Sequence, residues 1–276
     1  MFGAGALLLP FPLSLPLTNG GKKKTRSLAR QATKLPGPGS IIISSYTSPL
    51  DAIYLAAIFD PIFTTSYPTT KLVERVSLPM FLWRYFTAPA LHPAESANMV
   101  SLPELLRKKP NCTIVLFPEA TPTNGRGILR FTPALSTAPP ATKIFPISLR
   151  YSPPDITTPV PNALFKFLWS LLSRPTHCIR VRIAETIYND GAAAVQRDDG
   201  DDDDGDDDDD DDYGLAAGGD DSGDAAAVDE HEALGGVCER GSEALARIGR
   251  IKRLNLGVRD KIGFVQAWKR RNGLMG

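Results

Sequence analysis

The stretch "VLFPEATPTNGRGILRF" holds the residues that could most readily bind a phosphate group. An apolar run ends there at Pro118 and Glu119, and a loop of threonine, asparagine and glycine follows, with Arg126 and Arg130. Hydroxyls, loop amides and guanidinium groups after a strand can together hold a phosphate. The same pattern also fits an ordinary strand-exit turn with solvated arginines, and the stretch alone favours neither interpretation.

A second candidate is the carboxylate of Asp51 in "SSYTSPLD". Ser48, Pro49 and Asp51 stand at the N-cap, N1 and N3 positions of a helix start, which makes Asp51 half of a capping box. Its negative charge also suits the positive end of the helix. Taken alone, this stretch favours a structural role for Asp51 over a chemical one.

Together the two stretches resemble the paired motifs of the glycerolipid (PlsC-like) acyltransferases, His-x4-Asp followed by Phe-Pro-Glu-Gly-Thr. Four residues match the second motif: Phe117, Pro118, Glu119 and Thr121. Ala120 takes the place of the glycine, and Pro146 matches a proline that opens a later strand in the lysophospholipid branch. The resemblance extends over about residues 38–190 and is greatest to the fungal lysophosphatidic acid:oleoyl-CoA acyltransferases.

This resemblance implies transfer of a fatty acyl group from acyl-CoA, as co-substrate, to the hydroxyl of a lysophospholipid such as lysophosphatidic acid, without a metal or other cofactor. In the family the motif histidine removes the hydroxyl proton, and the aspartate orients it. On this chain Asp51 takes the aspartate's place and Tyr46 the histidine's. Arg126 substitutes for an arginine that often follows the motif threonine. The implied substrate-binding residues are Ser48, Phe117, Pro118, Glu119, Thr121, Asn124, Gly125 and Arg126.

Tyr46 is the main departure from the family pattern. A phenol with a pKa near 10 is only about one part in a thousand ionised at neutral pH. Three hypotheses remain. Tyr46 donates a hydrogen bond to the developing oxyanion while Asp51 or a water serves as the base, Tyr46 is itself a base whose pKa is lowered near the arginines, or the site is inactive. His92, between the motifs, is a weaker candidate for the base. The alternative function is a non-catalytic protein that binds lipid or acyl-CoA in membrane trafficking, whereas no GxSxG motif supports a hydrolase.

The elements that must position these residues follow from hydrophobic periodicity. The predicted strands cover residues 41–45, 112–118, 142–151 and 177–185. The predicted helices cover residues 49–59, 101–109, 162–174 and 235–253. Strands separated by helices indicate a single α/β domain with a central, largely internal mixed sheet flanked by helices, as in the glycerol-3-phosphate acyltransferase-like fold. Residues 61–89 hold clustered aromatics that fit either a partly apolar, membrane-facing surface or ordinary core packing.

Charge and composition divide the 276 residues into four parts. Residues 1–26 are an apolar and basic segment that could anchor the chain to a membrane, and 27–190 form the acyltransferase domain. Residues 191–228 are an acidic insertion predicted to be disordered, and 229–276 a basic helical segment that packs on the domain.

The zero net charge hides a basic body. Residues 198–224 hold 16 of the 31 acidic residues and no basic one, which leaves 31 basic against 15 acidic residues elsewhere. Such a body favours acyl-CoA, lysophospholipid and an anionic membrane surface as partners, and no nucleic-acid motif is apparent. The three cysteines lack zinc-ligand spacing and indicate reduced thiols. The resemblance implies the cytosolic face of the endoplasmic reticulum or of lipid droplets.

Overall fold

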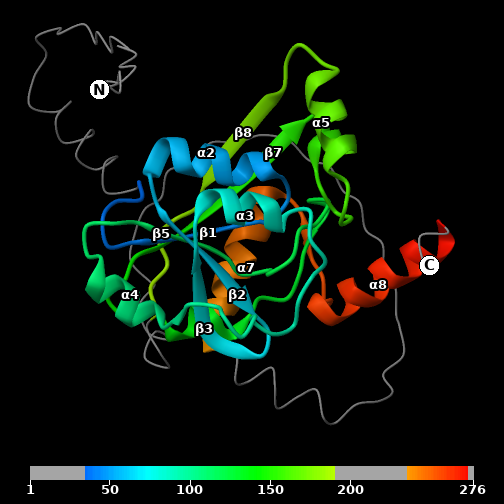
Figure 1. The fold of residues 1–276 in the computed structure, drawn as a ribbon. Coiled ribbons are helices and arrows are strands. Elements are labelled where there is room, and N and C mark those ends of the chain that lie inside the picture. Colours follow the sequence, from blue (N-terminus) through cyan, green and yellow to red (C-terminus); the bar gives the residue numbers. More distant parts are fainter. Residues whose placement is uncertain (1–34, 190–234, 273–276) are drawn as a thin grey trace, which may run out of the picture. The chain divides into compact units, whose positions relative to one another are not determined.

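The computed structural model describes residues 35–189 and 235–272 (Figure 1). The predicted N-terminal anchor and the predicted acidic insertion lie outside these residues. The strands are β1 (Ile41–Ser44), β2 (Ile62–Tyr67), β3 (Thr70–Val76), β4 (Met99–Val100), β5 (Ile114–Phe117), β6 (Gly127–Ile128), β7 (Ile144–Ser152), β8 (Cys178–Ile183) and β9 (Lys252–Arg253). The helices are α2 (Pro49–Phe59), α3 (Leu78–Arg84), α4 (Leu102–Lys108), α5 (Leu164–Leu172), α7 (Gly235–Gly249) and α8 (Val258–Arg271), with 3-10 turns η1 (Pro133–Thr137) and η2 (Pro154–Ile156).

Seven strands form one mixed sheet in the order β4-β3-β2-β5-β1-β7-β8. The four central strands, β2, β5, β1 and β7, run parallel to one another. At the edges, β3 and β4 on one side and β8 on the other run antiparallel to their neighbours. This confirms the predicted α/β fold with a central mixed sheet.

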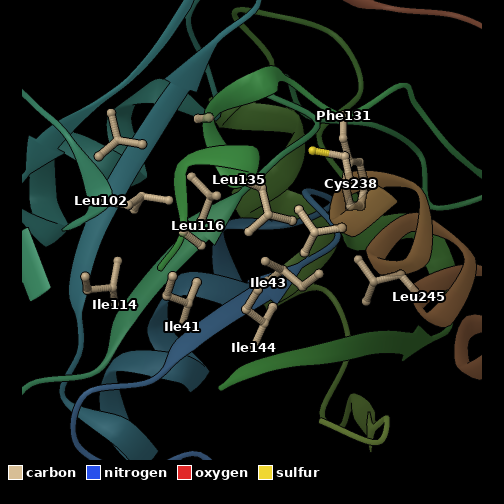
Figure 2. Packing of buried hydrophobic residues seen from close by; sticks show 14 of the residues in the cluster. Ile41, Ile43, Leu102, Ile114, Leu116, Phe131, Leu135, Ile144, Cys238 and Leu245 are labelled. Atoms are coloured by element: carbon tan, nitrogen blue, oxygen red, sulfur yellow. The ribbon is translucent and has the colours of Figure 1, made fainter. Parts of the chain in front are cut away.

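Strand β1 lies inside this sheet, between β5 and β7, and is buried on both faces. Ile41 and Ile43 point to the face covered by α4, η1 and α7, where they pack with Ile114, Leu116 and Leu245 (Figure 2). Because side chains alternate along a strand, Ile42 points to the other face. Helices α2, α3 and α5 contribute to the core on that second face. The three consecutive isoleucines of β1 therefore pack into two different cores, one on each face of the sheet.

The segment after α2 contains strands and a helix that the hydrophobic pattern did not predict. Residues 61–89 form the β2–β3 hairpin and α3, and most of their aromatic side chains are buried, including Phe63, Phe81, Tyr85 and Phe86. Core packing is thus the better of the two interpretations of this segment, although Trp83 is exposed. Within the described residues, no helix has the length and apolar character needed to cross a membrane.

Candidate active site

The candidate residues meet at the carboxyl ends of the parallel strands β1, β5 and β7. This is the edge at which open α/β sheets usually bind their ligands. The loop from β1 to α2 carries Tyr46 and Ser48, and the loop after β5 carries Glu119 and Arg126. Because β1 pairs with β5 on one side and β7 on the other, three segments far apart in the sequence converge here.

Asp51 is fully buried and accepts four hydrogen bonds. Its Oδ2 accepts from the backbone N–H of Thr47 (2.9 Å), from the Thr47 hydroxyl (2.9 Å) and from the backbone N–H of Ser48 (2.8 Å). Its Oδ1 accepts from the hydroxyl of Tyr151, at the end of β7, at 2.5 Å. The predicted capping box is confirmed, and it engages only Oδ2.

Glu119 joins the two motif stretches. Its Oε1 accepts from the backbone N–H of Tyr46 (3.1 Å) and its Oε2 from that of Leu129 (3.0 Å). The carbonyl oxygen of Tyr46 in turn accepts from the backbone N–H of Thr123 (2.7 Å). The peptide groups on both sides of Tyr46 are therefore held by the second motif and the loop after it.

Ala120, which takes the place of the glycine in the motif that the sequence resembles, has a left-handed backbone conformation. Its φ is 55°, in the left-handed region, where any side chain beyond glycine is disfavoured by roughly 1–2 kcal/mol. Gly125 has a φ of 68°, and a Cβ added to it would approach Thr47 Cγ2 to 3.3 Å. The loop after β5 thus passes close to the start of α2, where glycine is the residue that fits.

Burial makes both carboxyl groups weaker acids than usual. It raises the pKa of Asp51 to about 6, although the hydrogen bonds from Tyr151, Ser48 and Thr47 oppose the shift. It raises the pKa of Glu119 to about 7, against the hydrogen bonds from the amides of Leu129 and Tyr46. Each group can therefore exchange a proton close to neutral pH.

The side chain of Tyr46 lies in the second core. Its ring contacts Phe81, Tyr85 and Phe117, with centroids 5.5, 4.4 and 5.1 Å away, and the side chain is almost entirely buried. Burial raises its pKa far above 10, although Arg84 acts in the opposite direction. The hypothesis that Tyr46 is a base with a lowered pKa is therefore wrong.

A pocket of about 330 Å³ opens beside Asp51. Its lining combines two arginines with hydroxyl and amide groups and an apolar wall: Thr47, Asn124, Gly125, Arg126, Leu149, Arg150, Tyr151, Pro154 and Thr157. The side chains of Thr47 and Tyr151 are hydrogen-bonded to Asp51, so the pocket reaches the carboxylate through them. The arrangement can bind an anion at Arg126 and hold a hydroxyl group near Thr47 and Tyr151, the two lining residues bonded to Asp51.

The pocket contains some of the predicted residues and leaves others out. Asn124, Gly125 and Arg126 line it, but Thr121 is fully buried, and its hydroxyl has no hydrogen-bond partner in the described part of the chain. His92 lies in the loop between α3 and β4 and is not part of the lining.

Sequence reasoning missed Thr47, Arg150 and Tyr151. Only a weak signal was available for Tyr151: it follows Ile147 and Leu149 at alternate positions of β7, on the face that carries the second core. Nothing in the sequence alone associates that position with Asp51.

Comparison with known proteins found one informative relative. Over 147 residues, 53% of this chain and 49% of the relative, the chain is 31% identical to a Schizosaccharomyces pombe protein named "Putative lysophosphatidic acid:oleoyl-CoA acyltransferase". The match supports a relationship to the acyltransferase family. The matched region spans about half the length of this acyltransferase relative. No family model matches the chain, and no solved structure matches it.

Proposed function

We propose that this protein transfers a fatty acyl group from acyl-CoA to the free hydroxyl of lysophosphatidic acid, which forms phosphatidic acid and coenzyme A. The name of the Schizosaccharomyces pombe relative supports the reaction class. The observation that carries the proposal is the pocket, because its lining combines Arg126 with Thr47 and Tyr151, whose hydroxyls donate to the buried Asp51. This acceptor carries a phosphate and a free hydroxyl, and the two parts of the pocket lining suit these two groups.

The roles of the residues follow from their positions. Arg126 and the loop at Asn124 and Gly125 bind the acceptor phosphate, since guanidinium groups pair well with phosphate oxygens. The acceptor hydroxyl lies near Thr47 and Tyr151, next to Asp51. Holding hydroxyl and thioester together converts a bimolecular reaction into an effectively unimolecular one, and the thioester is already an activated acyl donor.

A second candidate is a protein that binds lipid or acyl-CoA without catalysis. The observation that favours it is Tyr46, because its buried phenol with a raised pKa cannot serve as the base that the motif histidine provides. This candidate retains the anion-binding pocket but assigns no proton transfer to Asp51. An activity measurement separates the two.

The purified protein is expected to form labelled phosphatidic acid from labelled oleoyl-CoA and lysophosphatidic acid. Arg126→Ala is expected to raise KM for lysophosphatidic acid about tenfold or more, because a hydrogen bond to a charged group contributes roughly 1.5–3 kcal/mol. With monoacylglycerol, which lacks the phosphate, the substitution should change the rate little.

The matched control is Arg107→Ala, an exposed arginine on α4 outside the pocket. It should leave both acceptors unaffected. Absence of product from wild type with either acceptor would eliminate the enzyme in favour of the lipid-binding candidate. An equal loss with both acceptors in Arg126→Ala would remove the phosphate-binding role.

We also propose that the protein reaches its lipid substrate by docking α5 onto an anionic membrane surface. Phe165, Trp169 and Leu172 recur at intervals of four and three residues and are 85%, 77% and 79% exposed. Lys166 lies on the same exposed helix, and the following Arg174 forms a 3.0 Å ion pair with Asp155 of η2. An apolar face flanked by cations is typical of helices that lie in the membrane interface.

This docking places the substrate supply beside the pocket, because η2 also contributes Pro154 to the lining. The double substitution of Phe165 and Trp169 with serine is expected to reduce binding to phosphatidylcholine vesicles containing phosphatidic acid by at least about tenfold, measured by flotation. Trp83→Ser is the control, since Trp83 is 58% exposed on α3. Undiminished flotation of the double variant would refute the α5 surface.

A further inference from the structure

We propose that Tyr151 is the catalytic residue that takes the proton from the acceptor hydroxyl while it passes its own proton to Asp51. This inference rests on the proposed acyl transfer and assigns to β7 a role that neither motif contains. Tyr151 lines the pocket, and its hydroxyl donates to Asp51 Oδ1.

The two carboxylate oxygens of Asp51 have different hydrogen-bond partners. Oδ2 accepts from Thr47 twice and from Ser48 once, all at the helix start, so it has a structural role. Oδ1 accepts from the Tyr151 hydroxyl at 2.5 Å and from no other group in the described residues. A proton that arrives at Oδ1 therefore leaves the hydrogen bonds of the helix start intact.

The position at which the family has its histidine is unavailable for this task. Tyr46 points into the aromatic core between the sheet and α3, and it does not line the pocket. Tyr151 lies on β7, which pairs with β1 on the side opposite to β5. Because β7 extends beyond the end of β1, Tyr151 can reach Asp51. The Asp51–Tyr151 pair thus takes the place of the histidine–aspartate pair of the motif. The hydroxyl of Tyr151 replaces the imidazole, and it comes from β7 instead of the loop between β1 and α2.

The proton transfers balance over the whole reaction. The acceptor oxygen forms a bond to the thioester carbonyl carbon as its proton moves to Tyr151 Oη, and the Tyr151 proton moves to Asp51 Oδ1. The carbon–sulfur bond then breaks, and coenzyme A leaves as a thiolate. The proton returns from Asp51 through Tyr151 to the sulfur, which yields the ester, the free thiol and the starting protonation state.

The electrostatics of the pair support a concerted transfer. Burial and the Asp51 charge raise the pKa of Tyr151, so a free tyrosinate does not form. The raised pKa of Asp51, about 6, makes this carboxylate a better proton acceptor than an ordinary aspartate. Arg126 lines the same pocket and favours negative charge on the reacting oxygen, whereas the guanidinium of Arg150 donates to the carbonyl oxygen of Gly249 in α7.

Thr47 is the alternative candidate, because it also lines the pocket and its hydroxyl also donates to Asp51. It donates to Oδ2, however, which already accepts from two backbone amides. Protonation of Oδ2 would disrupt the hydrogen bonds that start α2. The geometry therefore favours Tyr151 over Thr47.

The test compares Tyr151→Phe, Thr47→Val and Tyr85→Phe in the same assay. Tyr151→Phe is expected to lower kcat for phosphatidic acid formation by about 10²- to 10⁴-fold, the usual effect of losing a positioned acid–base group. KM for lysophosphatidic acid should change little, since Arg126 remains. Tyr85→Phe removes a hydroxyl that is buried outside the pocket and without a partner in the described residues, so it should leave kcat unchanged.

Equilibrium binding of lysophosphatidic acid and urea unfolding are measured for each variant, so that misfolding is recognised. An active wild type with an equally active, folded Tyr151→Phe variant would overturn the role of Tyr151 but leave the proposed acyl transfer standing. A loss of kcat in Thr47→Val with retention in Tyr151→Phe would give the role to Thr47. A wild type without activity on any acceptor would overturn both proposals.

Discussion

Asp51→Asn is expected to lower kcat for acyl transfer by about 10²- to 10⁴-fold while the protein stays folded. The asparagine oxygen can still accept from the backbone amides of Thr47 and Ser48, so the start of α2 persists. Its amide group cannot accept a proton from Tyr151, and the negative charge is lost. The change therefore separates the chemical role of Asp51 from its role in the capping box.

The measurement is kcat and KM with oleoyl-CoA and lysophosphatidic acid, beside circular dichroism and urea unfolding. Asp60→Asn is the matched control, because it is the same substitution at the exposed C-cap of the same helix. Its positive φ of 42° is one that asparagine tolerates well. Retained activity in a folded Asp51→Asn variant would reduce Asp51 to a capping residue.

Glu119→Ala is expected to lower the free energy of unfolding by about 2–5 kcal/mol, since two buried backbone amides, those of Tyr46 and Leu129, would lose their acceptor. Alanine also leaves a cavity at a site that is 1% exposed. The change removes the connection between the first motif and the loop after β5, so a loss of activity is expected alongside the loss of stability.

Urea unfolding gives the midpoint and the slope for each variant. Glu239→Ala is the control, because its carboxylate is exposed and forms only a 3.5 Å surface ion pair with Arg253. Its expected cost is roughly 0–1 kcal/mol. If the Glu119→Ala midpoint shifted no more than that of the control, the joining role of Glu119 would be refuted.

The pH dependence of the free energy of unfolding gives a second test of Glu119. The pKa of Glu119 rises from its ordinary 4.5 to about 7 in the folded state, so between these values the folded state binds more protons than the unfolded chain. Its contribution to stability is therefore present below about pH 4.5 and is lost as the pH rises through 7. Glu119→Ala should flatten this decline, whereas an unchanged slope would argue against the raised pKa.

Hydrophobic patterning predicted the internal strands β1, β5 and β7, the edge strand β8 and most of the helices within a few residues. The predicted helix at 49–59 coincides with α2 (Pro49–Phe59), and the predicted strand at 142–151 with most of β7 (Ile144–Ser152). The β2–β3 hairpin was missed because β2 lies inside the sheet and buries Thr64, Thr65 and Ser66 beside its apolar residues. Periodicity recognises a strand by polar residues that face water, and these polar residues face the interior.

The sequence by itself determined the local chemistry of each motif. The helix start at Ser48 and Asp51 depends on two residues that are three positions apart. The loop after β5 contains Gly125 and Arg126, which are likewise close to each other in the sequence. Such contacts form between near neighbours in the chain, so their pattern is visible in the letters. For the same reason the carboxylate of Asp51 was recognised, but not its partner.

Only the tertiary structure decided which hydroxyl serves that carboxylate. Tyr46, five residues before Asp51, continues the alternation of β1 and so points into the aromatic core. Tyr151, 100 residues after Asp51, reaches Oδ1 because β7 pairs with β1 in parallel. The pairing and register of strands far apart in the sequence set that contact, and no local pattern encodes it.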